Sequence, residues 1–263
     1  MQRGLTWTIR DPPRAWCAPV TLLEVTGLSK RFGGLQAVSG LSLSLETGDV
    51  LGLIGPNGAG KTTAFNLISG FLGPDAGDVR FDGRSMLGLK PHAVCRAGLA
   101  RTFQLVRPFP HLSVLDNVKV GALGRTPVVA AAADKARAVI TQVGLDAKMH
   151  AAAGGLTLAE RKRLELARAL ATEPRLLLLD EVMAGLNPTE TGAIVELIKR
   201  INRSGISILL IEHNMRAVMS LSHRIVVLSF GEKIAEGPPA AVANHPKVIE
   251  AYLGDEYVHA PQA

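Results

Sequence analysis

The sequence of 263 residues is poor in aromatic residues and in cysteine. Phenylalanine, tyrosine and tryptophan together make up 4% of it, and its apolar residues are mostly alanine, leucine, valine and isoleucine. This composition favours helices packed on a sheet over a small β-barrel. There are two cysteines, Cys17 and Cys95, and Cys17 lies in an unusual N-terminal segment. We therefore expect no structural disulfide and a reducing, cytoplasmic setting.

Long apolar runs are also missing. No run reaches the roughly 18 apolar residues that a membrane-spanning helix needs. The N-terminal segment lacks the apolar centre of a signal peptide, because Asp11, Pro12 and Pro13 interrupt it. The net charge of +6 is mild. It is compatible with polyphosphate ligands or an anionic membrane face, and it predicts no nucleic-acid partner.

The two ends of the chain differ from the rest. Residues 1–19 hold both tryptophans and three prolines. We expect them to form a disordered extension or a misassigned leader, with a start near Val20 or Leu22, and a partner-binding arm is the alternative. Residues 257–263 are expected to form a tail, which leaves residues 20–256 as the folded domain.

The order of apolar patterns predicts the fold class. Strands are expected at residues 20–26, 41–45, 49–54, 176–179, 206–211 and 225–229, with a hairpin edge at residues 79–83. Helices are expected at residues 62–69, 189–202 and 214–221, and a helix-rich segment spans roughly residues 91–170. Alternating strands and helices build a mainly parallel sheet with crossover helices. The sequence therefore predicts an α/β fold with a helical insert.

A glycine-rich loop follows the expected strand at residues 49–54. It reads GPNGAGKT and matches the phosphate-binding pattern G-x-x-x-x-G-K-[ST] without a mismatch, between a strand and a helix. Its glycines allow successive backbone amides to turn inward, and the helix N-terminus adds partial positive charge. Lys61 is expected to reach the β- and γ-phosphates, and Thr62 to bind Mg²⁺. The nucleotide-binding residues are then Gly55, Pro56, Asn57, Gly58, Ala59, Gly60, Lys61, Thr62 and Thr63.

Polar residues follow later strands at the same expected edge of the sheet. Four leucines precede Asp180 and Glu181. Asp180 is expected to hold the Mg²⁺ shell, and Glu181 to polarise a water molecule as general base. His213 follows the strand at residues 206–211 and is expected to contact the γ-phosphate. Gln104 follows a short strand and is expected to reach Mg²⁺ or the attacking water.

Together these residues resemble an ATP-binding cassette (ABC) ATPase over nearly all of residues 20–256. The resemblance implies a P-loop NTPase fold with an antiparallel β subdomain, and an ATP hydrolase that uses ATP and Mg²⁺. By its match to the family, Phe32 stacks on adenine, and Gln104 is the Q-loop glutamine. Glu181 then matches the catalytic glutamate, and His213 the switch histidine.

The resemblance also implies a head-to-tail ATPase dimer. Each ATP would lie between residues 55–63 of one subunit and the signature motif of the other. The segment at residues 184–187 matches the part that touches the opposite subunit, with Asn187 where many members have Asp. The signature is usually LSGGQ, and its counterpart here is Leu156 followed by Thr157, Leu158, Ala159 and Glu160.

This signature departs from the common form. Thr157 keeps the hydroxyl that contacts the partner's γ-phosphate, Ala159 adds a methyl group, and Glu160 places a carboxylate near ATP. Thr157 and Glu160 also have the spacing of a capping box that opens a helix. Arg161, Lys162 and Arg163 either offset the added carboxylate or form a solvated basic face.

More narrowly, the chain resembles the branched-chain amino acid import ATPases. Relatives of that group import urea, amides or other polar solutes, and a more distant one extracts lipopolysaccharide. The residues that carry this likeness are RFGGLQAV (31–38), RTFQLVRPF (101–109), DEVMAGLNPTE (180–190), IEHNM (211–215) and HPKVIEAYLG (245–254).

The resemblance implies partners and a location. The partners are a second ATPase subunit, identical or a sister chain, two membrane permease subunits and an extracytoplasmic solute-binding protein. The location is cytoplasmic, peripheral on the inner face of the cell membrane. Residues 105–115, with Pro108, Phe109 and Pro110, are expected to dock a short helix of the permease, and simple packing is the alternative. A soluble non-transport ABC ATPase and a small P-loop kinase are the competing classes.

Overall fold

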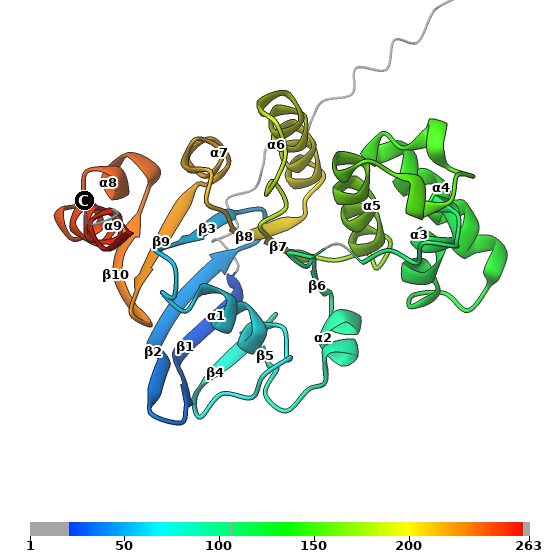
Figure 1. Cartoon of the computed structure of the whole chain (residues 1–263). Helices are drawn as coiled ribbons and strands as arrows, with labels where there is room; N and C mark the ends of the chain where they lie inside the picture. Colours follow the sequence, from blue (N-terminus) through cyan, green and yellow to red (C-terminus); the bar gives the residue numbers. More distant parts are fainter. Residues whose placement is uncertain (1–20, 106, 260–263) are drawn as a thin grey trace, which may run out of the picture.

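The computed structural model describes residues 21–105 and 107–259, and its centre is a six-stranded sheet (Figure 1). The strand order is β10-β9-β3-β8-β7-β6. Neighbouring strands from β9 to β6 are parallel, and β10 at the edge is antiparallel to β9. The strands are β3 (Val50–Ile54), β6 (Leu99–Arg101), β7 (Leu176–Asp180), β8 (Ser207–Ile211), β9 (Arg224–Ser229) and β10 (Glu232–Gly237).

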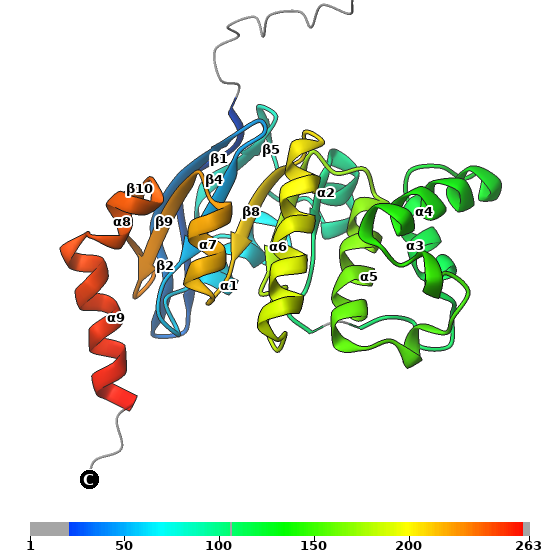
Figure 2. The same ribbon diagram turned by 90° about the horizontal axis from the view of Figure 1, so that it is seen from above.

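Both faces of the parallel sheet are covered, which explains the unbroken apolar runs of β7 and β8. Along β7, Leu177 and Leu179 pack into one core and Leu176 and Leu178 into a second, because successive side chains of a strand point to opposite faces. Figure 2 shows α6 (Pro188–Arg203) and α7 (Met215–Leu221) side by side on one face. On the other face lies α1 (Lys61–Ile68), whose Phe65 is fully buried.

A second, antiparallel sheet packs beyond α1. Its order is β2-β1-β4-β5, and the strands are β1 (Thr21–Phe32), β2 (Leu35–Glu46), β4 (Ala76–Phe81) and β5 (Arg84–Ser85). Asp82 and Gly83 form the two-residue turn between β4 and β5, both with positive φ. This is the backbone that an Asp-Gly hairpin turn requires. The predicted antiparallel subdomain and its hairpin edge are confirmed.

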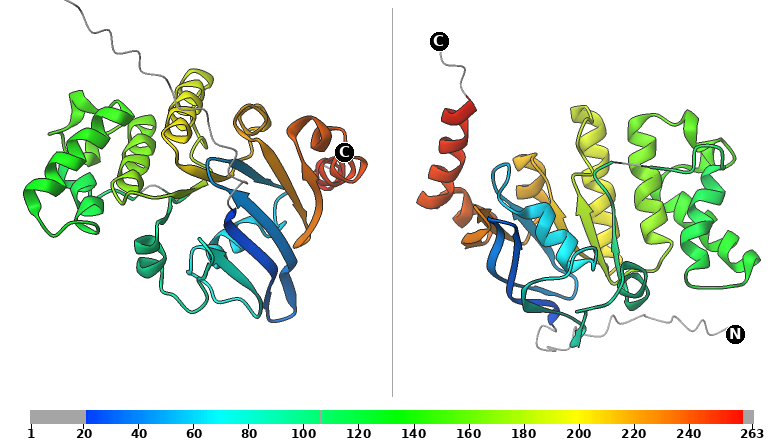
Figure 3. Two further views of the ribbon diagram at one scale, coloured as in Figure 1. Left: turned by 180° about the vertical axis from the view of Figure 1, so that it is seen from behind. Right: turned by 60° about the horizontal axis from the view of Figure 1, so that its bottom comes forward.

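The other helices lie at the two ends of the six-stranded sheet. Figure 3 shows a green helical group at the β6 end and an orange to red group at the β10 end. The first group is α3 (Val114–Leu123), α4 (Val129–Val143) and α5 (Leu158–Leu170), with short 3-10 turns η1 (Asp146–Lys148) and η2 (Ala153–Gly155). The second is α8 (Pro239–Ala243) and α9 (Pro246–His259), and α2 (Pro91–Ala97) precedes β6.

The α/β core that the sequence predicts is confirmed, but some extents were wrong. β1 continues to Phe32 and β2 already begins at Leu35, because the tight turn at Gly33 and Gly34 pairs these two ends directly. The short strand expected before Gln104 is β6, which pairs with β7 in the sheet and lies within the span predicted as helix-rich, roughly residues 91–170. β10, α8 and α9 were not predicted.

The prediction for the C-terminal tail can be compared with the structure, and the prediction for residues 1–19 cannot. Residues 257–259 continue α9, and the expected extension at residues 1–19 lies outside the described residues. Within residues 21–105 and 107–259, no helix combines the length and apolar character needed to cross a bilayer.

Asn117 of α3 holds the loop that leads from β6 to the helical group. Its side chain is fully buried, and its Oδ1 accepts a hydrogen bond from the Phe109 N–H at 2.9 Å. Its Nδ2 donates to the carbonyls of Phe109, Leu112 and Ser113 at 2.9–3.3 Å. One amide therefore satisfies both a donor and acceptors of a loop that has no strand or helix of its own.

We expect Asn117→Ala to lower the free energy of unfolding by at least about 2 kcal/mol, because these backbone groups lose their partner. Chemical denaturation at equilibrium measures the change. Asn244→Ala is the control, since Asn244 is exposed and its side chain donates to the nearby Ala240 carbonyl, and it should change stability by less than about 0.5 kcal/mol. Equal effects of the two variants would contradict the assigned role of Asn117.

Candidate active site

The loop from Gly55 to Thr62 connects the end of β3 to the start of α1 and depends on its glycines. Gly55 has φ +152° and Gly60 has φ +98°. A Cβ atom at Gly55 would lie 2.1 Å from the Leu228 carbonyl oxygen, and one at Gly60 would lie 2.3 Å from that of Ala37. Neither position accepts a side chain, so the neighbouring strands fix the shape of the loop.

Lys61 is buried and folds back over this loop. Its Nζ donates to the carbonyl oxygens of Gly55 at 2.7 Å and Pro56 at 2.8 Å. At the start of α1, no side chain caps the first backbone N–H groups. Ammonium and backbone amides therefore face the same concave space, which favours an anionic ligand.

An open cleft of about 660 Å³ lies over the loop and brings most of the predicted site residues together. The predicted residues that line it are Phe32, Asn57, Gly58, Ala59, Gly60, Lys61, Thr62, Thr63, Gln104, Glu181 and His213. Gly55, Pro56 and Asp180 do not line this cleft, and neither do the four residues of the signature counterpart at 157–160.

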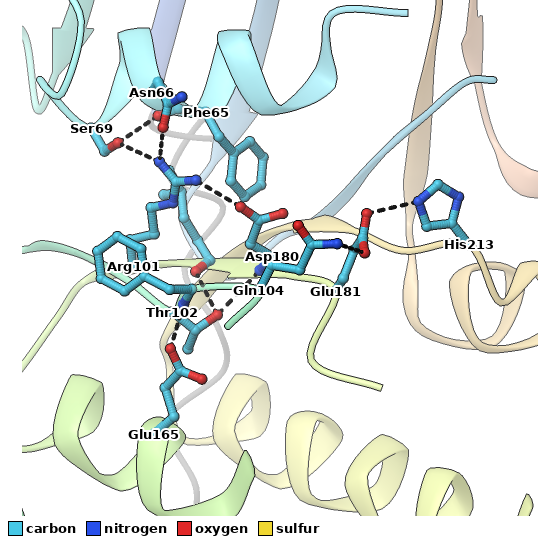
Figure 4. A network of polar contacts seen from close by, with 12 residues as sticks. Phe65, Asn66, Ser69, Arg101, Thr102, Gln104, Glu165, Asp180, Glu181 and His213 are labelled. Carbon is cyan, nitrogen blue, oxygen red and sulfur yellow. Dashed lines mark hydrogen bonds and ion pairs between the residues drawn. The ribbon is translucent and has the colours of Figure 1, made fainter. Parts of the chain in front are cut away.

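Glu181 is held between two of the other predicted residues (Figure 4). Its Oε2 accepts a hydrogen bond from Gln104 Nε2 at 2.6 Å, and its Oε1 lies 2.7 Å from His213 Nε2. Its backbone N–H donates to the Ile211 carbonyl at 2.9 Å, and its φ of +47° turns the chain sharply at the end of β7. Residues from three separate segments thus meet at one carboxylate.

Asp180 forms a buried ion pair with Arg101, a residue to which the sequence assigned no role. Arg101 Nη2 donates to Asp180 Oδ2 at 2.6 Å, and both side chains are almost fully buried. Arg101 Nη1 also donates to Asn66 Oδ1 and Ser69 Oγ of the α1 segment (Figure 4). The motif RTFQ contained Arg101, but nothing in its pattern showed that the guanidinium turns inward.

The residues expected to bind magnesium share a second cavity, of about 520 Å³. Thr62, Gln104 and Asp180 all line it, together with Arg101. A hydroxyl, an amide and a carboxylate supply oxygen atoms, which are the ligands that Mg²⁺ takes. The donor set therefore fits a magnesium ion, with the charge of Arg101 close by as a competitor for Asp180.

The signature counterpart forms the predicted capping box at the start of α5. The Thr157 N–H donates to Glu160 Oε2 at 2.8 Å, and the Glu160 N–H donates to Thr157 Oγ1 at 3.3 Å. Thr157 and Leu158 are exposed. The carboxylate of Glu160 is therefore bound to its own helix start, and Lys148 Nζ lies 3.9 Å from it.

The alternative of a solvated basic face for Arg161, Lys162 and Arg163 is wrong at Lys162. Lys162 is only 2% exposed, and its Nζ donates to the carbonyl oxygens of Glu181 at 3.0 Å and Gln104 at 3.3 Å. Arg161 and Arg163 also donate to backbone carbonyls. Sequence charge alone could not show this, because a lysine stem long enough to snorkel outward is also long enough to reach inward.

Two buried glutamates next to the site were not predicted. Burial raises the pKa of Glu212 to about 7, with the charge of Glu181 adding to the rise, although the Met183 N–H donates to Glu212 Oε1 at 2.9 Å. Burial likewise raises the pKa of Glu165, which accepts a 2.5 Å hydrogen bond from the Phe103 N–H. An acid between an apolar strand and a site histidine, as in IEHN, was the available signal for Glu212.

We expect Glu212 to make stability depend on pH. Its folded pKa lies above the ordinary 4.5, so its contribution is complete below pH 4.5 and is lost as pH rises through about 7. From about pH 5 to pH 8 the stability of the wild type should fall relative to Glu212→Gln, by on the order of 3 kcal/mol. Urea denaturation of both proteins at several pH values measures the difference, and a constant difference would contradict the raised pKa.

Two family models match the chain. The model described as ABC transporter matches residues 38–184. The model described as Branched-chain amino acid ATP-binding cassette transporter matches residues 232–258, which hold β10, α8 and most of α9.

Curated relatives and solved structures agree with these matches. The high-affinity branched-chain amino acid transport ATP-binding protein BraF of Pseudomonas aeruginosa is 42% identical over 250 residues, covering 89% of this chain and 98% of the relative. The protein LivG of Salmonella typhimurium, with the same description, gives the same values. A crystal structure of the ADP conformation of an ATP-binding cassette of an ABC transporter has a TM-score of 0.82 and 32% identity, over 89% of this chain and 99% of that one.

Proposed function

This chain belongs to the ABC transporter family and is an ATP-hydrolysing subunit of its branched-chain amino acid group, and from that premise we propose that it powers the uptake of branched-chain amino acids or a related polar solute. The match to the relatives that are named for this transport covers 98% of the length of each relative. The solute itself would be recognised by the permease and an extracytoplasmic binding protein.

The observation that carries the proposal is the meeting of Gln104, Glu181 and His213 at the rim of the phosphate cleft. For hydrolysis, a carboxylate must lie where an attacking water loses its proton, in line with the γ-phosphate. Glu181 takes the role of this base. His213 and Gln104 donate to it and hold its orientation, and in the proposed mechanism they would contact the γ-phosphate and the water.

The nucleotide would occupy the cleft in one orientation. Lys61, whose ammonium already lies among the loop carbonyls, binds the β- and γ-phosphates, and the backbone of residues 55–63 surrounds them. Phe32 lines the same cleft and is exposed, so its ring is available for stacking on adenine. Catalysis in this site is then positioning and charge stabilisation.

Thr62, Asp180 and Gln104 would hold Mg²⁺ in the cavity that they share. When bound, the ion would neutralise charge on the phosphate oxygens. Arg101 keeps Asp180 oriented toward α1 through its ion pair, so that the carboxylate does not turn back into the core.

We propose that the working unit is a dimer of ATPase subunits, identical or sister chains. The signature counterpart at residues 157–160 lies at an exposed helix start and does not line the cleft of its own chain. In a head-to-tail dimer it would face the nucleotide of the partner, with Thr157 contacting the γ-phosphate. Ala159 and Glu160 complete that contact surface, and residues 184–187 lie at the same interface.

The segment after Gln104 supplies the contact to the permease. Leu105, Phe109 and Leu112 are 69%, 45% and 39% exposed, which is a large apolar surface for one loop. Asn117 fixes the backbone of this loop, so the surface is presented in a defined shape. Two membrane permease subunits would each receive one such loop, which places the chain on the inner face of the cell membrane.

We expect Glu181→Gln to bind ATP but to lower turnover by at least about 100-fold, because the general base is lost while the nucleotide contacts remain. The variant should accumulate as an ATP-bound dimer, seen by size-exclusion chromatography with ATP and by phosphate release. Glu196→Gln, a change of an exposed glutamate on α6, is the control and should hydrolyse ATP normally. Wild-type hydrolysis by Glu181→Gln would remove Glu181 from this role.

We expect Phe109→Asp to abolish transport and copurification with the permease, since a charge would be buried in the apolar contact. ATP binding by the isolated subunit should stay unchanged. Val129→Asp is the control: Val129 is 61% exposed at the start of α4, where an acidic residue is tolerated. Transport at the wild-type rate with Phe109→Asp would count against the docking surface.

A further inference from the structure

We propose that Lys162 and Glu165 of α5 are positioning residues that clamp the backbone of the Gln104 segment, so that this segment and the start of α5 move as one unit. The inference rests on the proposed function, because it assigns to Gln104 a part in hydrolysis. It concerns two charged side chains that no motif singled out for a role in turnover.

The clamp acts on consecutive backbone groups. Glu165 Oε1 accepts the Phe103 N–H at 2.5 Å, and Lys162 Nζ donates to the Gln104 carbonyl at 3.3 Å. Lys162 and Glu165 are three residues apart in α5, so they lie on the same face of the helix. One face of α5 therefore binds both the Phe103 N–H and the Gln104 carbonyl.

Lys162 also reaches the second catalytic segment. The same Nζ donates to the Glu181 carbonyl at 3.0 Å, and Gln104 Nε2 donates to the Glu181 side chain at 2.6 Å. Gln104 and Glu181 are thus joined twice, by their side chains directly and by their backbones through Lys162. If the Lys162 side chain is removed, the side-chain contact between Gln104 and Glu181 remains. The backbones of these two residues are then no longer held at a fixed separation.

Charge and burial make this arrangement selective for a cation at residue 162. Both residues of the clamp are buried, and the Lys162 charge partly offsets the rise that burial causes in the pKa of Glu165 and Glu212. Two backbone carbonyls, those of Gln104 and Glu181, accept hydrogen bonds from the ammonium, and an apolar replacement would leave both without this donor.

The position of the clamp in α5 gives it a consequence for the dimer. The helix begins directly after Thr157, within the segment proposed to face the partner's nucleotide, and Lys162 lies little more than one helical turn further on. A shift of that helix start is therefore passed to Gln104 and Glu181 through two buried contacts. Binding at one nucleotide would adjust the catalytic contacts at the other.

The test is Lys162→Met, which keeps the length of the stem and removes the donor. We expect kcat for ATP to fall between about 10- and 100-fold with KM changed less than about 3-fold, because small displacements of catalytic groups have effects of this size. Lys162→Arg should restore most of the rate. Arg163→Met is the matched control, since Arg163 is the adjacent basic residue, is half-buried and donates to the Gly144 carbonyl rather than to the Gln104 or Glu181 segment.

A double-mutant cycle separates positioning from simple stability. Lys162→Met should lower kcat much less in a Gln104→Ala background than in the wild type, because coupled residues are not additive. The same factor in both backgrounds would overturn the clamp. Should Lys162→Met fail to fold, Lys162→Gln replaces it, and a folded Lys162→Gln protein with wild-type kcat would also overturn it.

The outcomes for the two proposals are distinct. If the wild type hydrolyses no MgATP, the proposed function fails. If the wild type is active and the folded Lys162 variants lose melting temperature without losing kcat, the function stands and the clamp is only a structural brace.

Discussion

Four carboxylates converge where the parallel strands end, and the charge balance among them governs the site. They belong to Glu165, Asp180, Glu181 and Glu212. Moving a carboxylate out of water costs several kcal/mol unless it gains a charged or hydrogen-bonded partner. The topology brings Asp180, Glu181 and Glu212 together, because β7 and β8 are parallel neighbours whose carboxyl ends meet at one edge, and α5 adds Glu165.

Two cations and several backbone N–H groups offset the charge of the buried carboxylates. Asp180 is paired with Arg101, while the charge of Lys162 lowers the pKa of both Glu165 and Glu212 and its Nζ donates to backbone carbonyls. Glu212 meets the cost of burial differently, through a pKa raised to about 7, which leaves it partly protonated near neutral pH. Glu181 alone is left with a partly open carboxylate, which is the condition for a base that must meet water.

The features that the sequence predicted correctly are those determined by local backbone geometry, by residue spacing within one turn or by burial of a whole strand. The loop glycines follow from backbone geometry, since a Cβ at Gly55 or Gly60 would collide with a neighbouring strand. The capping box at Thr157 follows from spacing within a single turn. The apolar runs of β7 and β8 follow from burial on both faces of a parallel sheet.

What the sequence did not predict depends on contacts between distant segments. The direction of Arg101 is set by Asn66 and Asp180, from α1 and β7, and that of Lys162 by carbonyls of two other segments. Edge elements were missed for a related reason. β10 has exposed and half-buried residues along most of its length, so it lacks the apolar alternation that marks a strand.

The divergent signature can be understood from the same charge argument. A carboxylate at Glu160 would repel a polyphosphate if it pointed outward from the helix start. It instead accepts the Thr157 N–H, and Lys148 lies near it, so its charge is partly neutralised within its own helix cap. The Thr157 hydroxyl, which accepts from the Glu160 N–H, is then held at the exposed tip. The glutamine that ends the common LSGGQ signature is therefore not needed to order this helix start, because the capping box orders it. In the proposed clamp, α5 then links this ordered start to Lys162 and the contacts of Gln104 and Glu181.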